Sequence, residues 1–228
     1  IWLDGKLEAD NARQLATGIR LANAYPDVVV AVNVGNEAFV SWSDHKLTEE
    51  RGLELLLQVK AAVRCPVTVA DDQLYWREPS NKLAAAVDFI AMHTYPVWGG
   101  HDIDEAMPIT IANFERVKRA HPGKTVVITE AGWPSYTDNA QNAPRAGDET
   151  KQKRHYGELM AWARANAVTT FWFEAFDEPW KGTGTEGHWG LFSEDLPDEA
   201  NPVTLSSTLT DSSGIPAPEI HYATSENS

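Results

Sequence analysis

The sequence has 228 residues but only one cysteine, Cys65, and no apolar run of the roughly 20 residues that cross a bilayer. A single cysteine excludes an internal disulfide and a thiolate zinc cluster. Basic residues are scarce, since 19 Lys and Arg stand against 33 Asp and Glu, for a formal net charge of −14. Phosphate backbones and anionic lipids repel such a chain, so we expect neither nucleic acid nor a membrane as partner.

Motifs that hold metals or nucleotides are also missing. The sequence has no His-Glu-x-x-His pair and no regular calcium loop. The segment Gly182-Thr183-Gly184-Thr185 lacks the further glycine and the following helix of a phosphate-binding loop. We therefore expect no metal and no organic cofactor.

Short β-rich runs alternate with stretches of helical periodicity along most of the chain. The predicted strands cover residues 1–4, 28–35, 66–70, 88–93, 125–130 and 168–174. Between them lie helical patterns, including one over 149–165 with Asp148 as its N-cap. Such alternation predicts parallel βαβ units with right-handed crossovers.

The spacing of the strands is typical of a (β/α)8 barrel, a TIM barrel in the α/β class. Eight strands close such a barrel, whereas six are predicted here, so we expect only about strands three to eight in residues 1–192. The first two units, roughly 60 residues, are then expected upstream of Ile1. Residues 193–228 are acidic and rich in Ser, Thr and Pro, which predicts a tail or linker.

Active sites of such barrels lie at the carboxyl ends of the strands. Glu37 and Glu130 each directly follow an apolar β run, and we pair them as candidate catalytic carboxylates. Cleavage of a glycosidic bond needs one protonated carboxyl group as acid and one ionised carboxylate as nucleophile or base. Taken alone, each glutamate is more typical of an ordinary surface salt bridge. His93, one residue inside a strand end, is compatible with a structural or a ligand-binding role.

Tryptophans gather at the same strand ends. The sequence has nine, and six lie at or just after a predicted strand: Trp42, Trp76, Trp98, Trp133, Trp180 and Trp189. Aromatic rings at the mouth of a cleft pack well on the C–H faces of sugars. The pattern predicts a carbohydrate cleft, although bulky loops that simply cover a barrel remain an alternative for each tryptophan.

Three motifs together carry a resemblance to a known family. They are Val32-Asn33-Val34-Gly35-Asn36-Glu37, the run from Ile128 to Ser135 with Glu130-Ala131-Gly132-Trp133-Pro134, and Phe173 to Lys181 followed by His188-Trp189-Gly190-Leu191-Phe192. Over roughly residues 1–192 the chain resembles glycoside hydrolase family 17, the β-1,3-glucanases and β-1,3-glucanosyltransferases of clan A, and most closely the microbial branch.

The resemblance implies roles for particular residues. Glu37 matches the acid/base at the end of the fourth strand, and Glu130 matches the nucleophile at the end of the seventh. Asn36 would bind the 2-hydroxyl of the sugar at the cleavage point, and Tyr95 would hold Glu130 by a hydrogen bond. Further substrate contacts are expected from Trp98, Trp133, Glu174, Trp180 and Lys181.

The function that we expect is a retaining endo-β-1,3-glucanase acting on laminarin-like β-1,3-glucan through a covalent glycosyl-enzyme. A β-1,3-glucanosyltransferase, a non-catalytic glucan-binding barrel and a metal- or cofactor-dependent barrel enzyme are the alternatives. We expect a monomer. Because a polysaccharide is too large to import, we expect a secreted or periplasmic protein.

Overall fold

The structure, a computed structural model, describes residues 1–138, 146–192, 203–210 and 216–220. Five parallel strands form one sheet whose order follows the chain. They are β1 (Val32–Asn36), β2 (Val67–Asp72), β3 (Ile90–His93), β4 (Val126–Ala131) and β5 (Thr170–Trp172). Each corresponds to one predicted strand, so the predicted β/α alternation is confirmed for these five.

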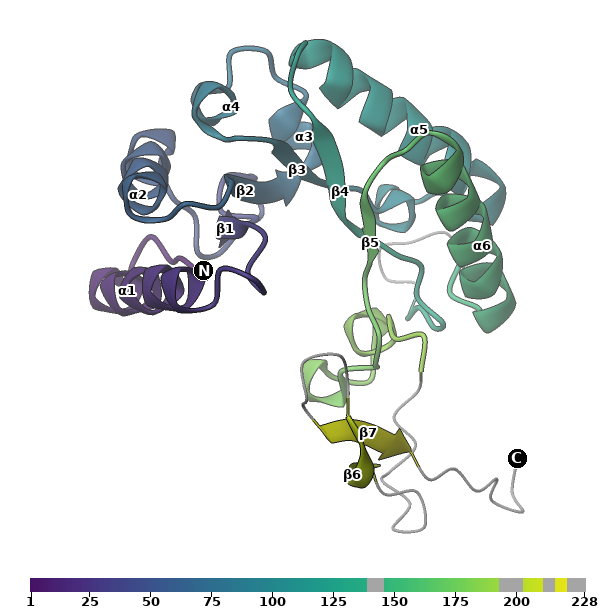
Figure 1. Cartoon of the computed structure of the whole chain (residues 1–228). Helices are drawn as coiled ribbons and strands as arrows, with labels where there is room; N and C mark the ends of the chain where they lie inside the picture. The colour runs from purple at the N-terminus through teal and green to yellow at the C-terminus, as the bar shows by residue number, and fades with distance from the viewer. Residues whose placement is uncertain (139–145, 193–202, 211–215, 221–228) are drawn as a thin grey trace.

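Helices precede the first strand and connect the others. They are α1 (Glu8–Ala24), α2 (Glu49–Ala62), α3 (Gln73–Trp76), α4 (Lys82–Ala86), α5 (Ile103–Ala120) and α6 (Glu149–Ala165), with short 3₁₀ turns η1 (Pro96–Gly99), η2 (Pro179–Lys181) and η3 (Thr185–Gly187). Figure 1 shows the sheet on the inner side of an arc, with the long helices α2, α5 and α6 along its outer side.

Capping side chains define where the long helices begin. Thr48 accepts a hydrogen bond from the backbone N–H of Arg51 at the start of α2, and Asp102 accepts one from Ile103 at the start of α5. Asp148 accepts from the backbone N–H of Lys151, as predicted for helix 149–165. Such caps satisfy donors that a helix leaves free at its first turn.

The core lies between the sheet and these helices. All four residues of β3 are buried, as is expected for a parallel strand covered on both faces. Leu56 and Val59 of α2 and Val117 of α5 are fully buried against the strands. This packing fixes where each strand ends, and hence where the polar residues at the strand ends project.

Two strand predictions need correction. Residues 1–4 do not form a strand: only Ile1 bonds to β1, through its amino group to Asn33 O and its carbonyl to Gly35 N. The strand predicted over 28–35 begins at Val32, because Val28 and Val29 form a turn with Tyr25. Valine favours strands, but Val28 and Val30 lack a partner strand here and are largely exposed.

Past residue 192, two further strands pair with each other. β6 (Val203–Thr210) and β7 (Pro216–Ile220) form a separate antiparallel pair. The predicted acidic tail or linker falls partly on these strands. Residues 193–202, 211–215 and 221–228 lie outside the described residues.

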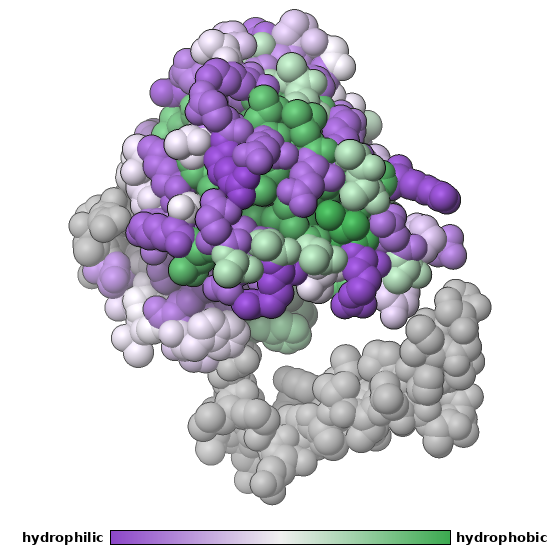
Figure 2. Space-filling model, turned by 90° about the vertical axis from the view of Figure 1, so that its left-hand side faces the viewer, coloured by the Kyte–Doolittle hydropathy of each residue, from purple (hydrophilic) through white to green (hydrophobic). Residues whose placement is uncertain are grey.

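Figure 2 shows the molecule from the side of α1 and α2, where apolar side chains gather at the centre of a more polar rim. Exposed apolar residues of α1, α2 and the segment before β1 include Leu21, Tyr25, Val28, Val30 and Leu57. None of the helices within the described ranges is both long and apolar enough to cross a membrane.

Candidate active site

A cleft of about 1110 Å³ opens at the carboxyl ends of the strands. Polar residues from three strand ends line it, namely Glu37 after β1, Asp72 of β2 and Glu130 of β4, and His93 of β3 lies buried against Glu37 and Glu130. The lining also includes Ile1, Trp2, Asn33, Asn36, Trp42, Gln73, Leu74, Tyr95, Pro96, Trp98, Gly99, His101, Ile109, Asn113, Phe173, Lys181, Glu186 and Trp189. The sequence-based expectation of a site at this end of the sheet agrees with the position of this cleft.

Glu37 lies on a sharply turned backbone. Gly35 has a φ of 95° and Glu37 itself a φ of 46°, both in the left-handed region. That region suits glycine but disfavours a residue with a side chain, and such strained residues cluster at active sites. The Glu37 N–H donates to Ala70 O at 2.9 Å, so β2 holds the turn in place.

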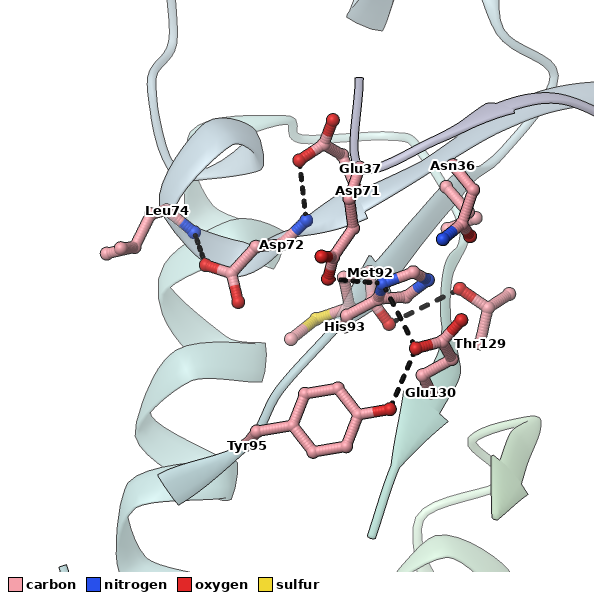
Figure 3. Close-up of polar contacts among 12 residues, drawn as sticks. Asn36, Glu37, Asp71, Asp72, Leu74, Met92, His93, Tyr95, Thr129 and Glu130 are labelled. Atoms are coloured by element: carbon pink, nitrogen blue, oxygen red, sulfur yellow. Dashed lines mark hydrogen bonds and ion pairs between the residues drawn. The ribbon is translucent and has the colours of Figure 1, made fainter. Parts of the chain in front are cut away.

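His93 lies between the two candidate catalytic carboxylates (Figure 3). Its Nδ1 atom is 3.0 Å from Oε1 of Glu37 and 3.5 Å from Oε2 of Glu130. The imidazole is fully buried, and its Nε2 atom has no hydrogen-bond partner. Burial lowers the pKa of His93, but the neighbouring Glu37 and Glu130 carboxylates outweigh burial, so the net direction is upward.

Glu130 receives a second contact from Tyr95. The phenol hydroxyl donates to Oε2 of Glu130 at 2.7 Å, the hydrogen bond that the resemblance implied. Burial raises the pKa of Glu130, while His93 and the Tyr95 hydroxyl act in the opposite direction. Burial and the Glu130 charge also raise the pKa of Tyr95 well above its usual value, so the phenol stays protonated and remains a donor.

The two glutamates are close enough for chemistry at one sugar carbon. One ligand atom each of Glu37, His93 and Glu130 lies within 4.8 Å of the other two. Carboxyl groups about 5 Å apart are typical of retaining glycosidases, and inverting enzymes have about 6.5 to 9.5 Å. The same three atoms of Glu37, His93 and Glu130 are also near enough to share a metal ion. In this structure, however, the Glu130 carboxyl group accepts a hydrogen bond from Tyr95, and the Glu37 carboxyl group contacts His93.

The six tryptophans predicted to line a cleft divide into three groups. Trp42, Trp98 and Trp189 line it, and Trp98 packs against the buried Trp189 with ring centroids 5.8 Å apart. Trp180 is 73% exposed and lies outside the lining. The remaining two, Trp76 and Trp133, are core residues.

For Trp76 and Trp133 the expectation of a cleft position is wrong. Both are fully buried, and each indole N–H donates to a backbone carbonyl at 2.8 Å, of Ala91 and Ala146 respectively. A substrate contact by Trp133 is therefore excluded. Its ring belongs to a core cluster beneath the cleft that also contains Trp189.

Asn36 and Lys181, both expected to contact substrate, line the cleft. Lys181 forms an ion pair with Glu178, and its Nζ atom lies 5.1 Å from the centre of the Phe173 ring. Glu174 lies outside the lining, and its Oε1 atom is buried without a hydrogen-bond partner. Burial, together with the nearby Glu178 and against Lys181, raises the pKa of Glu174 to about 7.

Sequence reasoning missed several residues of the cleft. Trp2 lines it and packs against the His45 ring at a centroid distance of 4.6 Å. Asp72 and Glu186 add two more carboxyl groups, and burial raises the pKa of Asp72 to about 6. The Asp71-Asp72 pair at the end of β2 is a sequence signal that could have identified Asp72. Trp2 carries no comparable signal, because it lies inside the run predicted as a strand over 1–4 and not at its end.

Comparison with known proteins adds relatives from fungi. The chain is 26% identical over 219 residues to a probable glucan endo-1,3-beta-glucosidase btgC of Aspergillus clavatus, matching 84% of this chain and 31% of that protein. It is 28% identical over 197 residues to a glucan 1,3-beta-glucosidase of Arthroderma benhamiae, matching 77% of this chain and 61% of that protein. The chain thus spans about a third of the length of the first relative and less than two thirds of the second.

Solved structures show the same architecture. An endo-laminarinase from Formosa Hel1_33_131 matches with a TM-score of 0.70 and 27% identity, over 80% of this chain and 59% of that chain. A glycoside hydrolase family 17 β-1,3-glucanosyltransferase from Rhizomucor miehei matches with a TM-score of 0.67 and 23% identity, over 86% and 71%. The second likeness supports the fold alone.

These matches agree with the arrangement of the strand ends. The five parallel strands alternate with helices as in the barrels of family 17, to whose β-1,3-glucanases and glucanosyltransferases the chain is distantly homologous. The pattern of the BtgE/BtgC glycoside hydrolase domain matches residues 1–190, which is most of the chain. The protein therefore belongs to the BtgE/BtgC glycoside hydrolase domain family.

Proposed function

We propose that the protein hydrolyses internal linkages of β-1,3-glucan with retention of configuration, Glu130 acting as nucleophile and Glu37 as acid/base. The observation that carries this proposal is the placement of both carboxylates within 4.8 Å, measured between one oxygen of each, in a cleft with aromatic walls. Inversion requires a water molecule between the second carboxylate, acting as base, and the sugar. This separation leaves no room for that water.

In the first step, Glu130 attacks the anomeric carbon while Glu37 donates a proton to the departing oxygen. The bond to the leaving sugar breaks as the ester to Glu130 forms. Tyr95 supports this step because its hydroxyl donates to Oε2 of Glu130. A donor at this position favours the ionised carboxylate that the attack needs.

In the second step, Glu37 takes a proton from water, and the hydroxyl attacks the anomeric carbon and releases Glu130. His93 contacts Glu37 through Nδ1 and can donate to it whenever that carboxyl group is ionised. The His93 imidazole can therefore stabilise the ionised Glu37 carboxylate, which exists after the first step and before the second.

The walls of the cleft support a sugar polymer as substrate. Trp98 is 37% exposed and Trp42 56% exposed, so both rings are available to pack against pyranose faces. Carboxyl, amide and ammonium groups of Asp72, Asn36 and Lys181 are available for hydroxyl groups. A polysaccharide substrate also supports our proposal of a secreted or periplasmic location.

The experiment is digestion of laminarin by the wild-type protein and by Glu37→Ala and Glu130→Ala, with products separated by chromatography. Glu158→Ala on α6 is the control, because Glu158 pairs with Arg154 on the helix surface. We expect short oligosaccharides from the wild type and the control, and a loss of at least about 10²-fold in both active-site variants. With 2,4-dinitrophenyl β-laminaribioside, whose leaving group departs without a proton, sodium azide should restore glycosyl transfer with opposite anomeric configurations in the two variants.

Azide that replaces the Glu130 carboxylate in Glu130→Ala attacks the substrate directly and gives an α-glycosyl azide. Azide that enters the space vacated by the carboxyl group in Glu37→Ala attacks the glycosyl-enzyme and gives a β-glycosyl azide. Intact laminarin with the wild type would contradict the proposal, and full activity of either active-site variant would contradict the assigned roles. Products longer than the substrate would instead indicate a glucanosyltransferase.

A further inference from the structure

Asp71 is a fully buried carboxyl group at the end of β2 that the proposed reaction does not use. Its Oδ2 atom accepts a hydrogen bond from the backbone N–H of Phe39 at 2.9 Å, and its Oδ1 atom accepts one from the N–H of Asp72 at 2.8 Å. A buried carboxyl group is costly unless it is hydrogen-bonded, and backbone donors are the usual compensation.

The Phe39 N–H belongs to the turn that carries Glu37. Phe39 follows Glu37 by two residues, and Glu37 has the disfavoured φ of 46°. On the other side of the turn, the Glu37 N–H donates to Ala70 O at 2.9 Å. Adjacent residues of β2, Ala70 and Asp71, therefore hold the turn from both sides of Glu37.

Charged and titratable groups surround Asp71 on the neighbouring elements. They are Glu37 after β1, Asp72 on its own strand and His93 on β3. Burial raises the pKa of Asp71 to about 7, the two backbone donors lower it, and the charges of Glu37 and His93 act in opposite directions. The carboxyl group thus lies in the same electrostatic environment as the catalytic pair without reaching the cleft, whose lining does not include it.

We propose that Asp71 is a positioning residue for Glu37: through the Phe39 N–H it holds the turn in the one backbone conformation that aims the Glu37 carboxyl group at the departing oxygen. This inference rests on the proposed role of Glu37 as acid/base. It predicts that loss of Asp71 resembles partial loss of general-acid catalysis more than loss of substrate binding.

Leaving-group dependence separates this role from a merely structural one. A sugar hydroxyl leaves only when it is protonated, whereas a dinitrophenolate leaves without a proton. Misplacement of Glu37 therefore slows cleavage of a laminari-oligosaccharide but leaves the first-turnover release of dinitrophenolate from 2,4-dinitrophenyl β-laminaribioside nearly unchanged. General damage to the barrel slows both reactions.

The test variant is Asp71→Asn, which keeps the volume but places an amide where two N–H donors converge. Asp88→Asn is the matched control, because Oδ2 of Asp88 accepts from the Val67 N–H at 2.7 Å, where β2 begins. For Asp71→Asn we expect kcat on laminarihexaose to fall about 10- to 100-fold with KM within about twofold, and the dinitrophenolate burst to stay within about threefold. The control should keep both rates within about twofold.

Equal losses on the two substrates, or a rise in KM alone, would overturn the inference. A wild-type protein that cleaves neither substrate would instead contradict the proposed function, so the two failures are distinguishable. Should Asp71→Asn not fold, as judged by circular dichroism, Asp71→Glu replaces it, since it keeps the charge and moves the acceptor by one methylene. For Asp71→Glu we then expect the same fall in kcat on laminarihexaose with a nearly unchanged dinitrophenolate burst, and the absence of this difference overturns the inference.

Discussion

The Nδ1 atom of His93 lies 3.0 Å from Oε1 of Glu37, although β2 separates their strands in the sheet. The imidazole therefore reaches across the end of β2 to join two positions that are 56 residues apart. Its Nε2 atom is buried without a partner, and Nδ1 is the ring atom that contacts the two glutamates. The contact makes His93 a link between the proposed acid/base and the proposed nucleophile.

Substitution of His93 tests this link. His93→Leu removes the Nδ1 donor, and we expect kcat/KM on laminarin to fall about 10- to 100-fold, the value of a hydrogen bond to a charged group. His93→Asn can place its side-chain amide near the position of Nδ1 and should retain most of the activity. Steady-state kinetics of the two variants provide the measurement. Equal losses in both would show that the ring itself, and not the donor, is required.

Tyr95→Phe removes the hydroxyl that donates to Glu130 at 2.7 Å. The ionised nucleophile loses a charged hydrogen bond, so we expect kcat to fall by about 10- to 100-fold with little change in KM. Tyr75→Phe is the control, because the Tyr75 hydroxyl donates to Glu49 at 3.0 Å outside the cleft lining. An unchanged kcat in Tyr95→Phe would remove Tyr95 from the mechanism.

Trp98 and Trp180 test which tryptophans bind sugar. Trp98 lines the cleft, so Trp98→Ala should raise KM for laminari-oligosaccharides about tenfold, the loss of roughly 1.4 kcal/mol of packing. Trp180 is exposed outside the lining, and Trp180→Ala should leave KM within about twofold. Fluorescence titration with laminarihexaose gives an independent affinity for both. The reverse order of effects would mean that the substrate path runs past Trp180.

His155 predicts an acid sensitivity of the fold. The ring is fully buried between Trp133 and Trp172, at centroid distances of 5.5 and 5.8 Å, and neither ring nitrogen has a hydrogen-bond partner. Burial lowers the pKa of His155 to about 4, so the unfolded chain takes up this proton first as pH falls below 6.5. Stability from this group is present above pH 6.5 and is lost between pH 6.5 and about 4, by roughly 3 kcal/mol.

The measurement is urea unfolding of the wild type and His155→Leu at pH 7 and pH 4. The difference in free energy of unfolding between the two proteins should move by about 3 kcal/mol in favour of the leucine variant on acidification. Taking the difference cancels the contributions of the other titrating groups. A difference that does not vary with pH would mean that His155 gains a partner or solvent on protonation.

Much of the fold could be predicted because the local signals agree with the tertiary structure. Helix α6 begins where Asp148 provides a cap, and the bounds of β2 to β5 fall within two residues of the predicted bounds. The two errors share a cause. Residues 1–4 and 28–31 have the composition of strands, but a strand exists only where a neighbour offers its backbone, and sequence composition does not report the neighbour.

The site divides in a similar way. The positions of Glu37 and Glu130 at strand ends in the cleft could be predicted because motif and strand end coincide. The misassigned Trp133 and Trp76 also follow strand ends, but an indole that finds a carbonyl for its N–H packs equally well inward. Which way a ring turns depends on residues distant in sequence, such as the alanines whose carbonyls accept from these two indoles. The role of His93 between the glutamates likewise depends on the relative height of three strands.

The four strands that carry Glu37, Asp72, His93 and Glu130 are consecutive neighbours in one hydrogen-bonded sheet. In the proposed reaction, the sheet therefore sets the spacing of the catalytic groups, and the loops and outer walls of the cleft determine which polymer binds. Exchange of the loops that bear Trp42 and Trp98 offers a route to altered chain specificity in which the spacing of the two glutamates is inherited unchanged.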